Sequence, residues 1–151
     1  MINQDYKEML SILLDNEVKF LVVGAHATAS HGYIRRATGD IDLWVEASKE
    51  NSEKIYKSLA EFGAPGEHYN IDTFEEKGVI LQIGIAPRRI DIITNIDGVN
   101  FHEAWNNKKI VEIENLKIPI LDKNDLIKNK LSTGRDKDIL DARKLNEMVE
   151  P

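Results

Sequence analysis

The spacing of apolar residues divides the chain into short helices and strands. Apolar positions between residues 6 and 16 recur at helical spacing, whereas those between 41 and 45 alternate with polar ones, as in a half-buried strand. Helices are predicted over residues 6–16, 25–31, 123–131 and 136–148 and from a Ser48 cap to residue 62, and strands over 20–23, 41–45, 79–85, 89–93, 109–113 and 116–120.

This order of elements predicts an α/β (α+β) protein, with a mixed β-sheet flanked by helices and a short helical tail over residues 122–149. The chain shows no internal repeat, low-complexity tract or linker, and its 151 residues suit one domain. We therefore expect a single domain that spans residues 1–151.

Composition and charge narrow the class of protein. The 20 basic side chains are outnumbered by 26 acidic ones, which disfavours a broad nucleic-acid-binding surface. The absence of cysteine excludes disulfides and thiolate zinc sites. The longest apolar run, Phe20 to Val23, is too short to cross a bilayer, and the amino terminus lacks the features of a signal peptide. These features predict a soluble, cytoplasmic protein.

Two carboxylates stand out at the start of the strand predicted over residues 41–45. Residues two apart on a strand share a face, so Asp40 and Asp42 would point the same way. At about 4 Å they would repel by ~1 kcal/mol in water and ~4 kcal/mol at an effective dielectric of about 20. A divalent cation would relieve this repulsion. The simpler alternative is a polar strand end with both side chains in water.

A third carboxylate, Asp91, lies among strand-forming residues, where burial without a partner would be costly. One interpretation is an ion pair with Arg88 or Arg89. The other places Asp40, Asp42 and Asp91 around two Mg²⁺ (or Mn²⁺) ions, with Asp91 also acting as general base.

Two segments of the chain offer positive charge or backbone N–H groups that could bind a phosphate. A turn at Gly24 and Ala25 opens the short helix before Asp40, and Arg36 follows that helix, next to Arg35. In the tail, Lys130, Arg135 and Lys137 are further candidates. Alternatively these tail residues are solvated, with Lys137 paired to Asp141 four residues later.

Histidine and tryptophan residues are assigned mainly structural roles. Of His26 and His31, we expect one to face solvent and the other to fix the turn through a hydrogen bond, because no His/Cys spacing supports zinc. Trp44 and Trp105 could stack on a base, yet packing in the core is the favoured interpretation.

Taken together, these motifs resemble the DNA polymerase β-type nucleotidyltransferase superfamily. Its pattern is a Gly-Ser or Gly-Gly turn, then Asp-x-Asp, then a later strand Asp. The small bacterial branch related to AbiEii-type toxins and minimal nucleotidyltransferase antitoxins is the most similar. The matching positions are Gly24, Asp40, Asp42 and Asp91, the segments 23–27, 31–32, 36–38 and 40–43, and a tail motif of Lys130, 134–138 and Asp141.

The resemblance implies a Mg²⁺-dependent transfer of a nucleoside monophosphate from a nucleoside triphosphate to a hydroxyl group. The acceptor would be a protein, as in antitoxins that modify a partner toxin, or an RNA end. Asp40, Asp42 and Asp91 would bind metal, and Gly24, Ala25, Arg36, Lys130 and Lys137 would bind the nucleotide.

One departure from the pattern concerns Ala25, where active relatives often carry Ser or Gly. Ala25 offers no hydroxyl, although Thr28 or Ser30 would be an alternative source. A catalytically weakened nucleotide-binding or partner-binding module is therefore the second hypothesis. A structural domain whose carboxylates meet by coincidence is the third.

Overall fold

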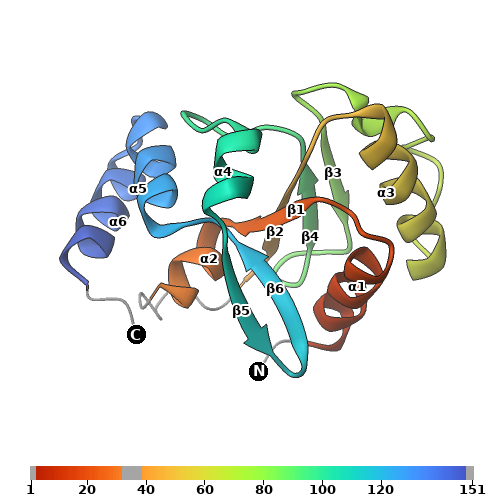
Figure 1. The fold of residues 1–151 in the computed structure, drawn as a ribbon, viewed down its shortest axis with the longest axis horizontal. Coiled ribbons are helices and arrows are strands. Elements are labelled where there is room, and N and C mark those ends of the chain that lie inside the picture. The colour runs from red at the N-terminus through yellow and green to blue at the C-terminus, as the bar shows by residue number, and fades with distance from the viewer. Residues whose placement is uncertain (1–2, 32–38, 149–151) are drawn as a thin grey trace.

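A mixed sheet forms the centre of the molecule. In residues 3–31 and 39–148, the part of the chain that this computed structural model describes, six strands follow the order β3-β4-β2-β1-β6-β5 (Figure 1). β1 pairs antiparallel with β2 and parallel with β6, and β2 pairs parallel with β4. The strands are β1 (Phe20–Val23), β2 (Ile41–Val45), β3 (Ile80–Ile83), β4 (Ile90–Ile93), β5 (Lys109–Ile113) and β6 (Leu116–Ile120).

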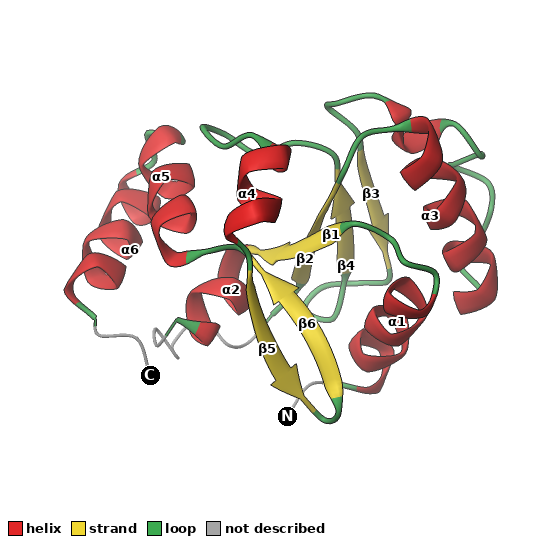
Figure 2. Cartoon of the chain, in the orientation of Figure 1, coloured by secondary structure: helices red, strands yellow, loops and turns green. Residues whose placement is uncertain are grey.

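Helices lie around this sheet in two groups (Figure 2). α1 packs against α3 near one end of the molecule, whereas α5 and α6 pack against each other at the opposite end and reach the sheet through α2. The predicted mixed sheet with flanking helices and a helical tail is confirmed. The helices are α1 (Gln4–Asp15), α2 (Gly24–Ser30), α3 (Lys49–Phe62), α4 (Phe101–Asn107), α5 (Lys123–Ser132) and α6 (Asp136–Glu147), with a 3₁₀ turn at Thr73–Glu75.

Local sequence signals account for most boundaries. Ser48 caps α3 by accepting a hydrogen bond from the Asn51 N–H at 3.1 Å. The β5–β6 hairpin turns through Glu114 and Asn115, both at positive φ, as a two-residue turn that matches the strand twist requires. The predicted strands 79–85 and 89–93 are shorter in the structure, because their inner ends form the loop between β3 and β4.

The sequence patterns missed α4. Its signal is present at its start, where Asn100 caps the helix by accepting from the Glu103 N–H at 3.3 Å. The helix is held by an aromatic cluster: Trp44 meets Phe101 edge-to-face at 5.0 Å, and Phe101 stacks on Trp105 at 5.9 Å. Trp44 is only 2% exposed, so packing rather than base stacking is confirmed for it.

None of the helices in the described ranges is both long enough and apolar enough to cross a membrane.

A buried asparagine joins three elements on the side of the sheet covered by α3. Asn51 is 3% exposed, and its side chain accepts from the Lys19 N–H at 2.8 Å. It also donates to the carbonyl groups of Lys19 at 3.1 Å and Glu46 at 2.9 Å. The amide thereby completes the backbone hydrogen bonding where β1 begins and β2 ends.

We expect Asn51→Ala to lower the free energy of unfolding by about 1–3 kcal/mol, because the Lys19 N–H and the Glu46 carbonyl group lose this side-chain partner, whereas the Lys19 carbonyl group keeps its hydrogen bond from the Glu46 N–H. Urea denaturation measures the change. Glu53→Ala, an exposed position on the same helix, is the matched control and should shift stability by less than ~0.5 kcal/mol. Equal stability of the two variants would contradict this account of Asn51.

Candidate active site

Asp42 and Asp91 lie side by side on two neighbouring parallel strands. The register of β2 and β4 pairs Asp42 directly with Asp91, and neighbouring strands are about 4.8 Å apart. Asp40 precedes β2, and its Oδ1 accepts a hydrogen bond from the Arg89 N–H at 2.9 Å, at the start of β4. The structure thus brings together the three carboxylates that the sequence nominated.

Gly24 brings the first turn of α2 against this cluster. A Cβ atom at Gly24 would lie 2.3 Å from Oδ2 of Asp42, and the residue has a φ of +67°. Both the close approach and the left-handed backbone require glycine. The hydroxyl groups of Thr28 and Ser30 donate to carbonyl groups within α2, at 3.0 Å each, and neither lines the cavity described below. They do not replace the hydroxyl that Ala25 lacks.

The environment of Asp42 disfavours its ionised form. Burial, followed by the charge of Asp91, a side-chain hydrogen bond with Asp91 and the charge of Asp40, raises the pKa of Asp42 to about 6. Arg89 opposes this shift only in part.

Arg89 is the direct partner of two of these carboxylates. Its guanidinium forms two hydrogen bonds with Asp91, Nε to Oδ1 at 2.6 Å and Nη2 to Oδ2 at 3.0 Å. Nη2 also lies 3.3 Å from Oδ2 of Asp40. The alternative expected for Asp91, an ion pair with Arg88 or Arg89, is therefore present, and it involves Arg89.

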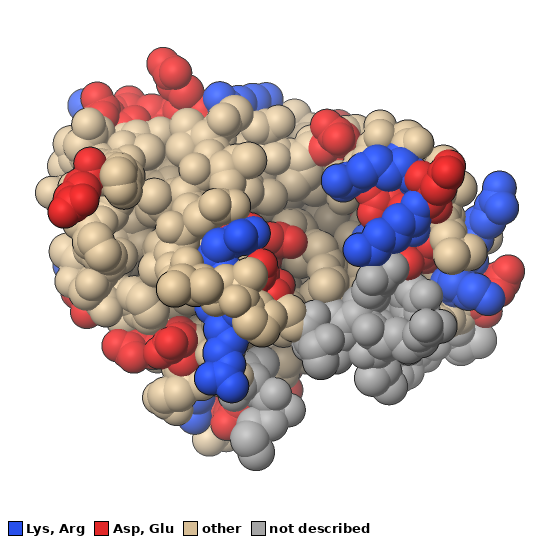
Figure 3. Space-filling model, turned by 180° about the vertical axis from the view of Figure 1, so that it is seen from behind, with Lys and Arg blue, Asp and Glu red and all other residues tan. Residues whose placement is uncertain are grey.

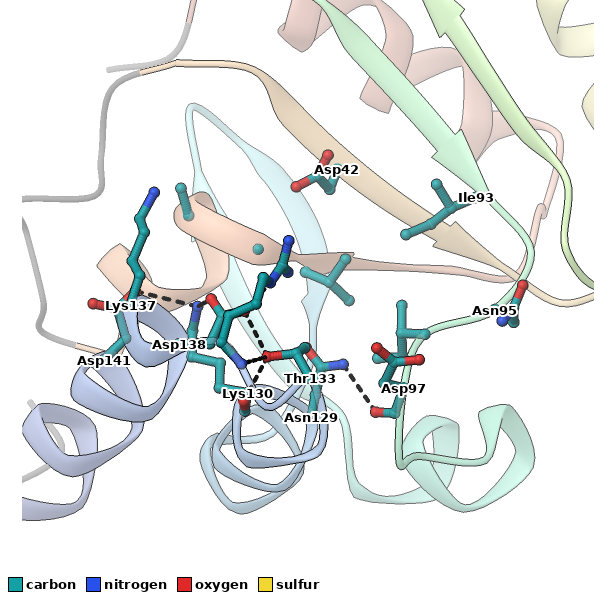
Figure 4. A pocket seen from close by; sticks show the side chains of 15 residues that line it. Asp42, Ile93, Asn95, Asp97, Asn129, Lys130, Thr133, Lys137, Asp138 and Asp141 are labelled. Atoms are coloured by element: carbon teal, nitrogen blue, oxygen red, sulfur yellow. Dashed lines mark hydrogen bonds and ion pairs between the residues drawn. The ribbon is translucent and has the colours of Figure 1, made fainter.

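A cavity of about 420 Å³ opens beside Asp42, between the sheet and the helical tail. On the face opposite to that of Figure 1, acidic and basic side chains gather around a hollow (Figure 3). Figure 4 shows Asp42 on one side of the cavity and the α5 and α6 side chains on the other. The residues that line the cavity are Val23, Gly24, Ala25, Asp42, Ile93, Asn95, Ile96, Asp97, Asn129, Lys130, Thr133, Arg135, Lys137, Asp138 and Asp141.

Lys130 is held in place by acidic residues of α6. It is 8% exposed, and its Nζ lies 3.4 Å from Asp141 and 3.8 Å from Asp138. Burial raises the pKa of Asp138, but hydrogen bonds from Thr133 and Arg135 and the charge of Lys130 outweigh it, so the pKa is lowered overall. The expectation that Asp138 and Asp141 orient the basic residues is confirmed for Lys130.

The remaining predicted residues fall in two groups. Ala25, Lys130 and Lys137 line the cavity, and no ion pair joins Lys137 to Asp141 in the described part of the chain. Arg35 and Arg36 lie outside the described residues. Sequence reasoning missed the cavity residues Asn95, Asp97, Asn129 and Thr133, for which no motif offered a signal.

His26 in α2 and His31, which follows this helix, are both hydrogen-bonded. His31 is 1% exposed and its Nε2 lies 2.7 Å from the Leu121 carbonyl oxygen, which fits the histidine expected to fix the turn. The second histidine was expected to face solvent. His26 is instead half-buried, its Nε2 lies 3.1 Å from the Gly39 carbonyl oxygen, and its ring meets Tyr6 edge-to-face.

The donor set of this cluster fits a hard divalent cation. Carboxylate oxygens are the protein ligands that Mg²⁺ and Mn²⁺ prefer, and the raised pKa of Asp42 shows that the cluster would gain from added positive charge. Within residues 3–31 and 39–148, however, no three His, Asp or Glu side chains form a ready-made coordination shell. Arg89 holds oxygens of Asp40 and Asp91 that such a shell would use.

A mixed sheet that places paired carboxylates beside a glycine-initiated helix is the architecture expected of a nucleotidyltransferase. Residues 1–148 match the family described as nucleotidyltransferase of unknown function (DUF6036), and the chain belongs to that family. No curated protein matches the sequence.

A solved structure shares the fold. A crystal structure from Thermotoga maritima, provisionally described as a nucleotidyltransferase, is 20% identical over 98% of this chain and 97% of that chain, with a TM-score of 0.65. At this identity the similarity shows a common fold.

We expect Asp42→Asn to stabilise the metal-free protein. The folded pKa of about 6 lies above the ordinary 3.8, so the folded state binds more protons between these values and stability falls as pH rises through this window. Above about pH 7 the variant should unfold with a free energy ~2 kcal/mol higher than the wild type, with little difference near pH ~4. Urea denaturation in the presence of EDTA measures the stability difference at both pH values. If the variant is no more stable than the wild type at the higher pH, ionised Asp42 does not destabilise the folded protein.

We expect Gly24→Ala to be more destabilising than Gly63→Ala by about 1–3 kcal/mol, because of the clash with Asp42. Gly63 has a φ of +88° and nothing within 4 Å of its Cβ position, so it controls for backbone strain alone. Thermal unfolding of both variants separates strain from clash. Equal losses would show that α2 can move away from Asp42 without cost.

Proposed function

We propose that this chain is a nucleotidyltransferase that depends on a divalent metal ion. It would transfer a nucleoside monophosphate from a nucleoside triphosphate to a hydroxyl group. The observation that carries the proposal is the pairing of Asp42 with Asp91 on adjacent parallel strands, beside Asp40 and a cavity lined by basic side chains. Family membership supports the same class of reaction.

Each part of the site has a task in this reaction. Asp40, Asp42 and Asp91 would hold Mg²⁺ or Mn²⁺, which supplies Lewis-acid activation of the attacking hydroxyl and neutralises charge on the phosphates. Asp91 accepts the proton of the acceptor hydroxyl. A bond forms between the acceptor oxygen and the α-phosphorus, the bond from the α-phosphorus to its bridging oxygen breaks, and pyrophosphate leaves.

The cavity provides the place for the triphosphate. Gly24 allows the backbone of α2 to approach, and Lys130 and Lys137 of the tail line the same cavity as Asp42. The Lys137 side chain is exposed, and its ammonium group makes no hydrogen bond or ion pair with the described residues. Its charge is therefore available to a phosphate. We also propose that Arg36 binds the triphosphate.

A protein hydroxyl is the favoured acceptor. The net charge is −6, and on the face shown in Figure 3 acidic and basic side chains are interspersed in the coloured part of the surface rather than gathered into a basic patch. An RNA acceptor would favour such a patch. The resemblance to AbiEii-type toxins and minimal antitoxins leads us to propose a partner protein of a toxin–antitoxin pair, in the cytoplasm.

The test is transfer of label from α-phosphate-labelled nucleoside triphosphates, with Mn²⁺ and a cell extract as source of acceptors. We expect Asp42→Asn and Asp91→Asn to lower the rate at least ~100-fold and EDTA to abolish transfer, because charge stabilisation at the phosphorus is lost. Glu53→Gln, on the exposed side of α3, is the control and should retain full activity. Undiminished transfer by Asp42→Asn would rule out the assigned site.

A partner-binding module is the second candidate, and Ala25 is the observation that favours it. Neither Thr28 nor Ser30 supplies the missing hydroxyl to the cavity. This candidate predicts that a nucleoside triphosphate with Mn²⁺ raises the melting temperature while no component of the extract is labelled.

A further inference from the structure

The side chain of Arg89 lies where a cation would be expected in the carboxylate cluster. Its Nε and Nη2 engage both oxygens of Asp91, at 2.6 and 3.0 Å, and Nη2 reaches Asp40 at 3.3 Å. Asp91 is 8% exposed, whereas the Arg89 side chain is 29% exposed, so the carboxylate is buried and the guanidinium covers it from the solvent side. The guanidinium is thus the counter-ion that the cluster has in this conformation.

A guanidinium and a divalent ion cannot use these oxygens in the same way at the same time. The paired hydrogen bonds occupy one lone pair on each oxygen of Asp91, on the side where a chelating metal ion would bind. A metal ion placed beside Arg89 would also meet the repulsion of a fixed positive charge. The competition would concern two of the three carboxylates, Asp40 and Asp91.

The structure also shows how Arg89 can leave while the carboxylates stay in position. The Asp40 carboxylate is held by the backbone N–H of Arg89, at 2.9 Å, which does not depend on the side chain. Asp91 is fixed within β4 by its pairing with both β2 and β3. The Arg89 side chain is 29% exposed, so it can turn toward solvent without crossing the core.

We propose that Arg89 is an internal counter-cation that a divalent metal ion must displace before the site becomes active. The inference rests on the proposed function, in that the three carboxylates are taken to hold the ion. Arg89 therefore lowers the affinity of the free protein for the metal ion.

Titration of the full chain with Mn²⁺ alone, followed by electron paramagnetic resonance of the free ion, tests this directly. We expect Arg89→Met, which keeps much of the side-chain volume and removes the charge, to lower the Kd for Mn²⁺ at least tenfold. Arg88→Met is the matched control, since Arg88 is exposed and makes no ion pair with the described carboxylates. Its Kd should stay within twofold of the wild-type value.

Further variants separate this inference from the proposed function. If Asp42→Asn abolishes Mn²⁺ binding while Arg89→Met binds like the wild type, the carboxylates bind metal but Arg89 does not compete, and the inference fails alone. If Asp42→Asn leaves binding unchanged, the proposed metal site fails as well. Weaker binding by Arg89→Met would show that Arg89 organises the cluster, which also overturns the inference.

A second substitution covers the case in which Arg89→Met does not fold. Arg89→Lys keeps the charge but cannot make paired hydrogen bonds with one carboxylate. We expect its Kd for Mn²⁺ to be about threefold to tenfold lower than that of the wild type. A Kd equal to or above the wild-type value would overturn the proposal.

Discussion

The repulsion between carboxylates on adjacent strands is the main electrostatic constraint on the residues of the candidate site. Parallel pairing of β2 with β4 sets Asp42 directly beside Asp91, and the backbone of Arg89 holds Asp40 next to them. A buried cluster of like charges costs free energy unless positive charge approaches it. The Arg89 side chain supplies part of this positive charge. The pKa of Asp42 is nevertheless raised, so its ionised form remains disfavoured.

Several features near this cluster would be unfavourable in a domain selected for stability alone. Gly24 is held at positive φ against a carboxylate, Asp42 is half-buried beside two other acids, and Lys130 is buried between Asp138 and Asp141. Local departures of this kind concentrate at functional sites in proteins whose remaining structure is locally consistent. Gly24, Asp42 and Lys130 all line the same cavity.

The two sides of the cavity come from parts of the chain with different structural roles. Asp42 lies on a central strand, where sheet register fixes it, whereas Lys130, Lys137, Asp138 and Asp141 come from the paired helices α5 and α6, which reach the sheet mainly through α2 (Figure 1). Thr133, Arg135 and Lys130 all converge on Asp138, so the tail carries its own charge balance.

The sequence by itself determined most of the elements and the chemistry of the site. Helix caps, turn residues and apolar periodicity act over a few residues, which is why the boundaries of α3 and the β5–β6 hairpin were predictable. The Asp-x-Asp spacing likewise indicated a shared face. The missed α4 had only seven residues and depends on packing against Trp44.

Tertiary structure alone decided which partners these residues meet. Arg89, not its neighbour Arg88, reaches Asp40 across 49 positions of the chain, and Asn51 joins backbone groups 32 positions away. The register that sets Asp42 beside Asp91, and the folding of the tail that brings Asn95 and Asn129 to one cavity, also depend on contacts between distant segments. Such contacts form only when the whole core packs, so no local pattern in the sequence encodes them.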